Sequence, residues 1–107
     1  MNNTLKNTQT LLWVEVASSP ERETAKAEYL QNSGPITAHH GGKQLNTFKV
    51  VDALGQQNSL QVAVLFSFPD KQAILDLFSD PEYKKLLHIR AKAFSEIRYT
   101  ILEEIEA

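Results

Sequence analysis

Apolar residues recur with a period of two in residues 10–17 and 60–68, which predicts two β-strands. The first segment carries Leu12, Val14 and Val16 on one face and Leu11, Trp13 and Glu15 on the other. The second segment carries Leu60, Val62, Val64, Phe66 and Phe68 on one face. Because the first segment has large apolar groups on both faces, we expect its sheet to be covered on both sides.

Two further segments complete the predicted sheet. Residues 36–51 are long for one strand and contain Gly41-Gly42, which predicts two strand pieces joined by a bulge or bend at the glycines. Residues 96–105 alternate again and predict the closing strand.

Start and stop signals between these strands predict two helical regions. Ser18-Ser19-Pro20 is typical of a helix start, and Asn32-Ser33-Gly34-Pro35 predicts the end of that first helix near Gln31. The second region begins at Pro69-Asp70 and restarts at Ser79-Asp80-Pro81-Glu82, where we expect a kink.

The resulting order, βαββαβ, predicts an α+β ferredoxin-like fold: a four-stranded antiparallel sheet with both helices on one face. We expect one domain over residues 10–107 and a flexible polar leader at residues 1–9. The helices leave one apolar sheet face bare, and such a surface normally marks an interaction site. We therefore predict a homodimer in which two sheets pack face to face, a dimeric α/β barrel.

The composition excludes several partners and cofactors. The 107 residues include 11 basic and 13 acidic side chains, and this net charge of −2 gives no basic field for nucleic acid. The absence of cysteine removes disulfides, thiolate metal sites and iron–sulfur clusters. With neither a secretory signal nor an apolar run of membrane-spanning length, we expect a cytoplasmic protein with no membrane partner.

Arg90, His39 and His40 are the candidate polar groups of a ligand site. Arg90 falls on the apolar stripe of the second helix, where its charge needs a partner. That partner is a ligand anion, an acidic residue such as Glu15 or Glu82, or a backbone carbonyl, unless the guanidinium reaches solvent. His39 and His40 are adjacent on a predicted strand, so only one of them can face a given pocket and no metal site is expected.

Trp13 and Tyr99 are the candidate apolar groups of the site. Both lie on predicted strands and could line a flat cavity near Phe48, or belong to the core or the dimer interface. Glu15 shares the strand face of Trp13, and burial there would make it a candidate general base.

The sequence resembles the family called domain of unknown function 1330. The resemblance is carried by Gly41-Gly42, by Phe66-Ser67-Phe68-Pro69, by Ser79-Asp80-Pro81-Glu82-Tyr83 and by Arg90. It implies the dimeric α/β-barrel fold. The tyrosine-rich first helix usual in the family is represented here only by Tyr29.

The resemblance implies no activity, because its superfamily includes cofactor-independent monooxygenases, haem-degrading enzymes and haem peroxidases. The Asn, Trp and His set of the haem-degrading relatives cannot be placed in this sequence, and we expect no cofactor.

Our leading hypothesis is a homodimer that binds a small apolar molecule, with an anionic or carbonyl end, in a pocket between the sheet and the second helix. Arg90 and one of His39 or His40 would hold the polar end. One alternative is a cofactor-independent monooxygenase or isomerase acting on a quinol or aromatic substrate, with His39, His40 or Glu15 as the catalytic base. The other is a structural or regulatory dimer without catalysis.

Overall fold

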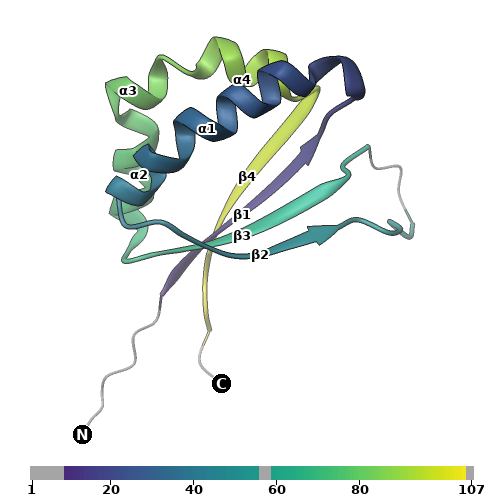
Figure 1. Cartoon of the computed structure of the whole chain (residues 1–107). Helices are drawn as coiled ribbons and strands as arrows, with labels where there is room; N and C mark the ends of the chain where they lie inside the picture. Colours follow the sequence, from purple (N-terminus) through teal and green to yellow (C-terminus); the bar gives the residue numbers. More distant parts are fainter. Residues whose placement is uncertain (1–8, 56–58, 106–107) are drawn as a thin grey trace, which may run out of the picture.

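The computed structural model describes residues 9–55 and 59–105, so most of the predicted leader lies outside the described residues. Four strands form one antiparallel sheet in the order β2-β3-β1-β4 (Figure 1). The strands are β1 (Thr10–Ala17), β2 (Lys43–Lys49), β3 (Val62–Phe68) and β4 (Glu96–Glu103). This strand order and the sequence of elements confirm the predicted ferredoxin-like α+β fold.

All the helices lie on one face of the sheet (Figure 1). After a short 3₁₀ turn, η1 (Pro20–Arg22), the first crossover is α1 (Glu23–His39). The second crossover is broken into α2 (Lys71–Ser79), α3 (Pro81–Lys84) and α4 (Leu87–Ala93). The predicted interruption is confirmed, because Asp70 caps α2 through the Ala73 N–H and Asp80 caps α3 through the Glu82 N–H, both at 2.8 Å.

The register of β1 decides which side chains share a face. Val14 lies opposite Val64 of β3 and Tyr99 of β4, and this row faces the helices. Trp13 lies opposite Leu65 and Thr100, and since successive residues of a strand alternate, this row is on the other face.

Helix α1 is longer than predicted, and the predicted stop near Gln31 is wrong. The helix continues through Pro35 to His39, and its distal turn is held by Ile36, which packs against the core. This packing outweighs the local helix-breaking tendency of Gly34-Pro35.

The glycine pair ends the helix, so the prediction of a strand bulge at Gly41-Gly42 is also wrong. Gly41 has a φ of 85° and donates to the Ala38 carbonyl, while the Gly42 N–H donates to the Thr37 carbonyl. These two hydrogen bonds form a Schellman motif, which needs a residue that tolerates the left-handed conformation. His39 is therefore the last residue of α1 and His40 is its C-cap, and neither is a strand residue.

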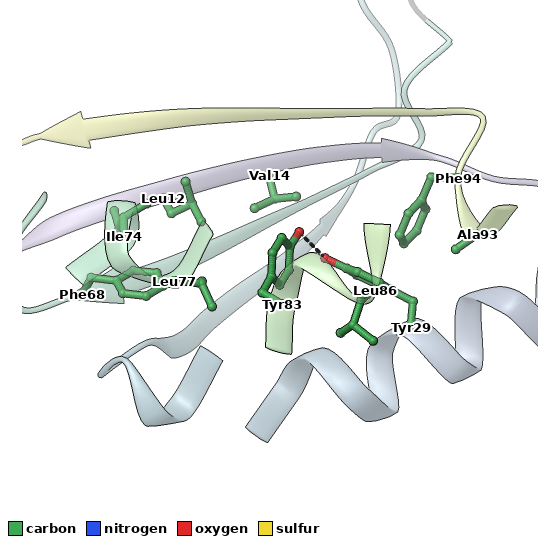
Figure 2. Close-up of a cluster of buried hydrophobic side chains, with 10 residues drawn as sticks. All are labelled: Leu12, Val14, Tyr29, Phe68, Ile74, Leu77, Tyr83, Leu86, Ala93 and Phe94. Atoms are coloured by element: carbon green, nitrogen blue, oxygen red, sulfur yellow. Dashed lines mark hydrogen bonds between the residues drawn. The ribbon is translucent and has the colours of Figure 1, made fainter. Parts of the chain in front are cut away.

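The hydrophobic core lies between the helix-facing side of the sheet and the helices (Figure 2). Phe68 of β3 and Ile74 of α2 are its most deeply buried large side chains. The remaining buried members are Leu12, Val14, Tyr29, Leu77, Tyr83, Leu86, Ala93 and Phe94.

The opposite sheet face carries no described helix (Figure 1). Trp13 of β1 and Phe48 of β2 contact each other across it, with ring centroids 5.8 Å apart. Leu11, Leu65 and Leu102 share this face by register. We call this apolar surface the open sheet face.

Candidate functional site

A cavity of about 340 Å³ lies between the helix-facing side of the sheet and α1. Its floor is formed by valines of β1 and β3, including Val14 and Val64, and its inner wall by Leu77 and Phe78 of α2. A volume of this size and an apolar lining with a few polar groups are typical of small-molecule sites. The sequence placed the pocket under the second helix, whereas the structure places it mainly under α1.

The cavity exists because the sheet-facing side of α1 is not apolar. Lys26, Tyr29, Ser33 and Thr37 line the cavity and recur at intervals of three and four, so they share one face of the helix. A helix usually buries a hydrophobic stripe against its sheet. Here α1 packs chiefly against α4, which leaves the space above β3 unfilled.

Three tyrosine hydroxyls meet at the wall of this cavity. The chain has three tyrosines, and all of them take part: Tyr29 of α1, Tyr83 of α3 and Tyr99 of β4. The hydroxyl oxygens of Tyr29 and Tyr83 lie 2.9 Å apart (Figure 2), those of Tyr83 and Tyr99 lie 3.1 Å apart, and those of Tyr29 and Tyr99 lie 3.3 Å apart. We call this group the tyrosine triad.

Arg90 of α4 holds the triad from outside the cavity. Its Nη1 donates to the Tyr83 hydroxyl at 2.9 Å and to the Tyr99 hydroxyl at 3.5 Å. The guanidinium also lies over both rings, with Cζ 5.9 Å from the Tyr83 centroid and 5.5 Å from that of Tyr99. Arg90 is not among the cavity-lining residues, so it reaches the site through the tyrosines and not directly as predicted.

Burial keeps Tyr29 and Tyr99 of the triad protonated. Removal from water, reinforced by the neighbouring tyrosines, raises the pKa of Tyr29 well above its ordinary value. Burial likewise raises the pKa of Tyr99, with a further contribution from Tyr83. At neutral pH these hydroxyls are therefore hydrogen-bond donors and not bases.

The structure does not bring His39 or His40 to the cavity, so their predicted role at the polar end is wrong. His39 is exposed at the end of α1, and the His40 ring stacks edge-on against it with centroids 5.3 Å apart. His40 Nε2 lies 2.8 Å from Asp80 Oδ2. This hydrogen bond, with the N–H of Glu82, lowers the pKa of Asp80 and ties the end of α1 to the start of α3.

Trp13 and Glu15 are also outside the cavity. Tyr99 lies opposite Val14 and faces the helices, whereas Trp13 and Glu15 occupy the open sheet face. The prediction that Trp13 and Tyr99 line the same cavity is therefore wrong, although Tyr99 does line it. Glu15 lies opposite Ala63 and Arg98 on that face, away from the proposed ligand.

Neither a metal centre nor a membrane span is found in the part of the chain that the structure describes. Residues 9–55 and 59–105 contain no cluster of histidine and acidic side chains able to hold a metal ion. Within the same ranges, no helix has the length and apolarity needed to cross a bilayer.

Most of the residues that build the cavity's polar wall were not predicted from the sequence. Tyr83 was noted only within a family motif, and Tyr29 only as a departure from the family pattern. Ser33 was assigned only to the predicted helix stop, and Lys26 and Thr37 were not predicted to have a role. Their spacing from residue 26 to residue 37 is the available signal, because it marks a polar stripe on a helix whose sheet-facing side should be apolar.

The ferredoxin-like fold of this chain matches that of solved dimeric α/β-barrel structures. A family model, Domain of unknown function (DUF1330), matches residues 11–105. The chain belongs to this family. Comparison with functionally curated proteins gave no match.

Solved structures with similar folds include proteins with different activities and a protein of unknown function. A protein of unknown function from Rhodopseudomonas palustris is 20% identical with a TM-score of 0.76, covering 95% of this chain and 86% of that one. Hydroxynitrile lyase from Passiflora edulis is 12% identical with a TM-score of 0.68, covering 95% and 98%. A putative antibiotic biosynthesis monooxygenase from Nitrosomonas europaea is 8% identical with a TM-score of 0.66, covering 96% of each. These likenesses concern the fold alone.

Proposed function

We propose that this protein is a homodimer that binds a small apolar molecule in the cavity under α1 and holds a carbonyl or other acceptor oxygen of that molecule on the tyrosine triad. The observation that carries the proposal is the convergence of three neutral hydroxyls at the wall of a mainly apolar cavity. Polar groups of this kind fix the orientation of a ligand, while the apolar walls supply most of the binding energy.

One hydroxyl of the triad can donate its hydrogen bond to a ligand in place of a neighbouring tyrosine at low energetic cost. The Tyr29 and Tyr99 oxygens form the longest side of the triangle, at 3.3 Å, so this is its weakest hydrogen bond. A ligand oxygen that accepts from Tyr29 or Tyr99 opens this side and leaves the two shorter contacts in place.

Arg90 strengthens this donation. A hydroxyl that accepts from a guanidinium becomes a better donor, because the cation polarises the chain of hydrogen bonds. Arg90 donates to Tyr83 at 2.9 Å, and Tyr83 contacts both other hydroxyls. The guanidinium thus strengthens the hydrogen bond to the ligand oxygen by polarising the tyrosine hydroxyls, without entering the cavity.

Dimerisation is supported by the open sheet face. Trp13, Phe48 and Leu65 lie on a face that no described helix covers. An apolar sheet surface of this kind is stabilised when a second copy covers it around a two-fold axis.

The residues that we expected to act as catalytic bases in a monooxygenase or isomerase do not line the cavity. His39, His40 and Glu15 are all outside the cavity lining, and the Tyr29 and Tyr99 hydroxyls stay protonated. We therefore propose ligand binding and assign no reaction. Proteins with this fold differ in activity, so the fold does not indicate which reaction this chain would catalyse.

A matched pair of ligands tests the triad's role. Butyrophenone and butylbenzene have similar apolar bodies, and butyrophenone alone has a carbonyl oxygen. We expect butyrophenone to bind more tightly in calorimetric titration. In Tyr99→Phe its affinity should fall about three- to tenfold, the value of one neutral hydrogen bond, while butylbenzene should be affected little.

The control variant is Thr24→Val, which removes a hydroxyl from the exposed side of α1. It should leave both affinities unchanged. If the ketone and the hydrocarbon bind equally to the wild type, or if neither binds, the proposed site is wrong.

A further inference from the structure

We infer that the molecule bound in this cavity is an anion whose carboxylate is held by Lys26, at the end of the cavity formed by the first turns of α1. This inference rests on the proposed ligand site and adds a second polar group to the ligand: an acceptor oxygen at the tyrosine triad and a carboxylate at the lysine.

The charges around the cavity are the first support. Lys26 is the one charged residue that lines the cavity, and no acidic residue among the described ones lines it. The three tyrosines add donors but no negative charge, since burial holds Tyr29 and Tyr99 in the protonated form. A cavity lined by one cationic side chain and by no acidic side chain favours a ligand that carries a negative charge.

The ion pair between Lys26 and Glu23 is weak enough that the lysine can also bind a ligand. Its Nζ lies 3.0 Å from Glu23 Oε2, but the side chains are 32% and 66% exposed for Lys26 and Glu23 respectively. Such solvent-exposed pairs between neighbouring turns contribute little stability. A carboxylate inside the cavity can therefore compete for the ammonium group.

Gln61 provides a second hydrogen-bond donor in the cavity lining, near the start of α1. Gln61 precedes β3 and Ser18 follows β1, so both lie near the start of α1. The Gln61 carboxamide oxygen accepts from the Ser18 N–H at 3.0 Å, which leaves the amide NH₂ as a donor. A carboxylate has two oxygens and can accept from Lys26 and Gln61 together.

Lys26 and Tyr29 line the same cavity from neighbouring turns of α1, so one ligand can reach both. Lys26 precedes Tyr29 by three residues, which is about 4.5 Å along the helix axis. A ketone oxygen at the triad and a carboxylate at Lys26 are thus joined by a short apolar spacer. An aryl keto acid with two methylenes between its polar groups is a ligand of this kind.

The test uses β-benzoylpropionate and its methyl ester, which differ only in the charge of the acid end. We expect the acid to bind more tightly than the ester. In Lys26→Gln the affinity of the acid should fall about five- to tenfold, while that of the ester should stay nearly constant. Lys71→Gln, which removes an exposed lysine from the start of α2, should change neither.

The variant Glu23→Gln gives an expectation of opposite sign. Removing the competing carboxylate should tighten binding of the acid by about two- to fivefold and leave the ester unaffected. If the acid and ester bind equally, or if Lys26→Gln weakens both equally, Lys26 does not hold a carboxylate, although the ketone site stands. If neither compound nor butyrophenone binds, the proposed function fails as well.

Discussion

We expect the wild type to sediment at about twice the 12.1 kDa mass of the chain, and the variant Leu65→Arg to be a folded monomer. Leu65 lies on β3 in the middle of the open sheet face, opposite Trp13 on one side and Asn46 on the other. In a face-to-face dimer an arginine here would be buried against its symmetry copy. Two unpaired like charges at a buried interface cost several kcal/mol, enough to abolish a micromolar dimer.

Leu75→Arg is the matched control. Leu75 of α2 is 40% exposed on the helix side of the molecule, so the same substitution should leave the dimer intact. Far-ultraviolet circular dichroism separates dissociation from unfolding, because the monomeric variant should keep the native spectrum. A wild type that sediments as a monomer, or a Leu65→Arg variant that remains dimeric, would show that the open sheet face is not the interface.

The free energy of unfolding should fall steeply above pH 10. The folded state raises the pKa of Tyr29 and Tyr99, so it binds more protons than the unfolded state once the pH exceeds the ordinary tyrosine value of about 10. The stabilisation is complete below that pH and is lost as the pH rises toward the folded-state values. Each tyrosine should contribute a slope of about 1.4 kcal/mol per pH unit.

Urea denaturation at several alkaline pH values measures this slope. In Tyr29→Phe one titrating group is absent, so the slope should decrease by about half. Tyrosinate absorbance gives a second measurement, because all three tyrosines of the chain belong to the triad. Ordinary ionisation of Tyr29 and Tyr99 near pH 10 in the native protein would contradict their burial in the triad.

The strands and the helix starts could be predicted because their signals are local. Alternation in residues 10–17 and 60–68 gave the strands and their faces, and Asp70 and Asp80 cap the helices where the sequence indicates. The end of α1 could not be predicted in the same way. Gly34-Pro35 is a stop signal in isolation, and only packing of Ile36 against the core carries the helix beyond it.

The errors in the candidate site follow from these non-local effects. His39 and His40 were placed on a strand because the glycine pair was interpreted as a bulge instead of a helix end. Trp13 and Tyr99 were placed together because alternation within each strand does not say which face of one strand matches which face of the next. That information lies in the register, which pairs Tyr99 with Val14.

The triad could not be found by spacing, because its members come from three separate elements. Arg90 was recognised as a charge in need of a partner, which is correct, but its partners are neutral hydroxyls and not an acid. A half-buried guanidinium supported by tyrosine hydroxyls has no sequence signature beyond the presence of the residues.

The most direct test of the ligand site is a crystal structure of the wild-type protein with butyrophenone. We predict that the ketone lies between α1 and β3, with its oxygen within about 3.2 Å of the Tyr29 or Tyr99 hydroxyl and its phenyl ring against Val14 and Val64. A ketone bound elsewhere, or a cavity that closes and leaves the triad undisturbed, would contradict the account.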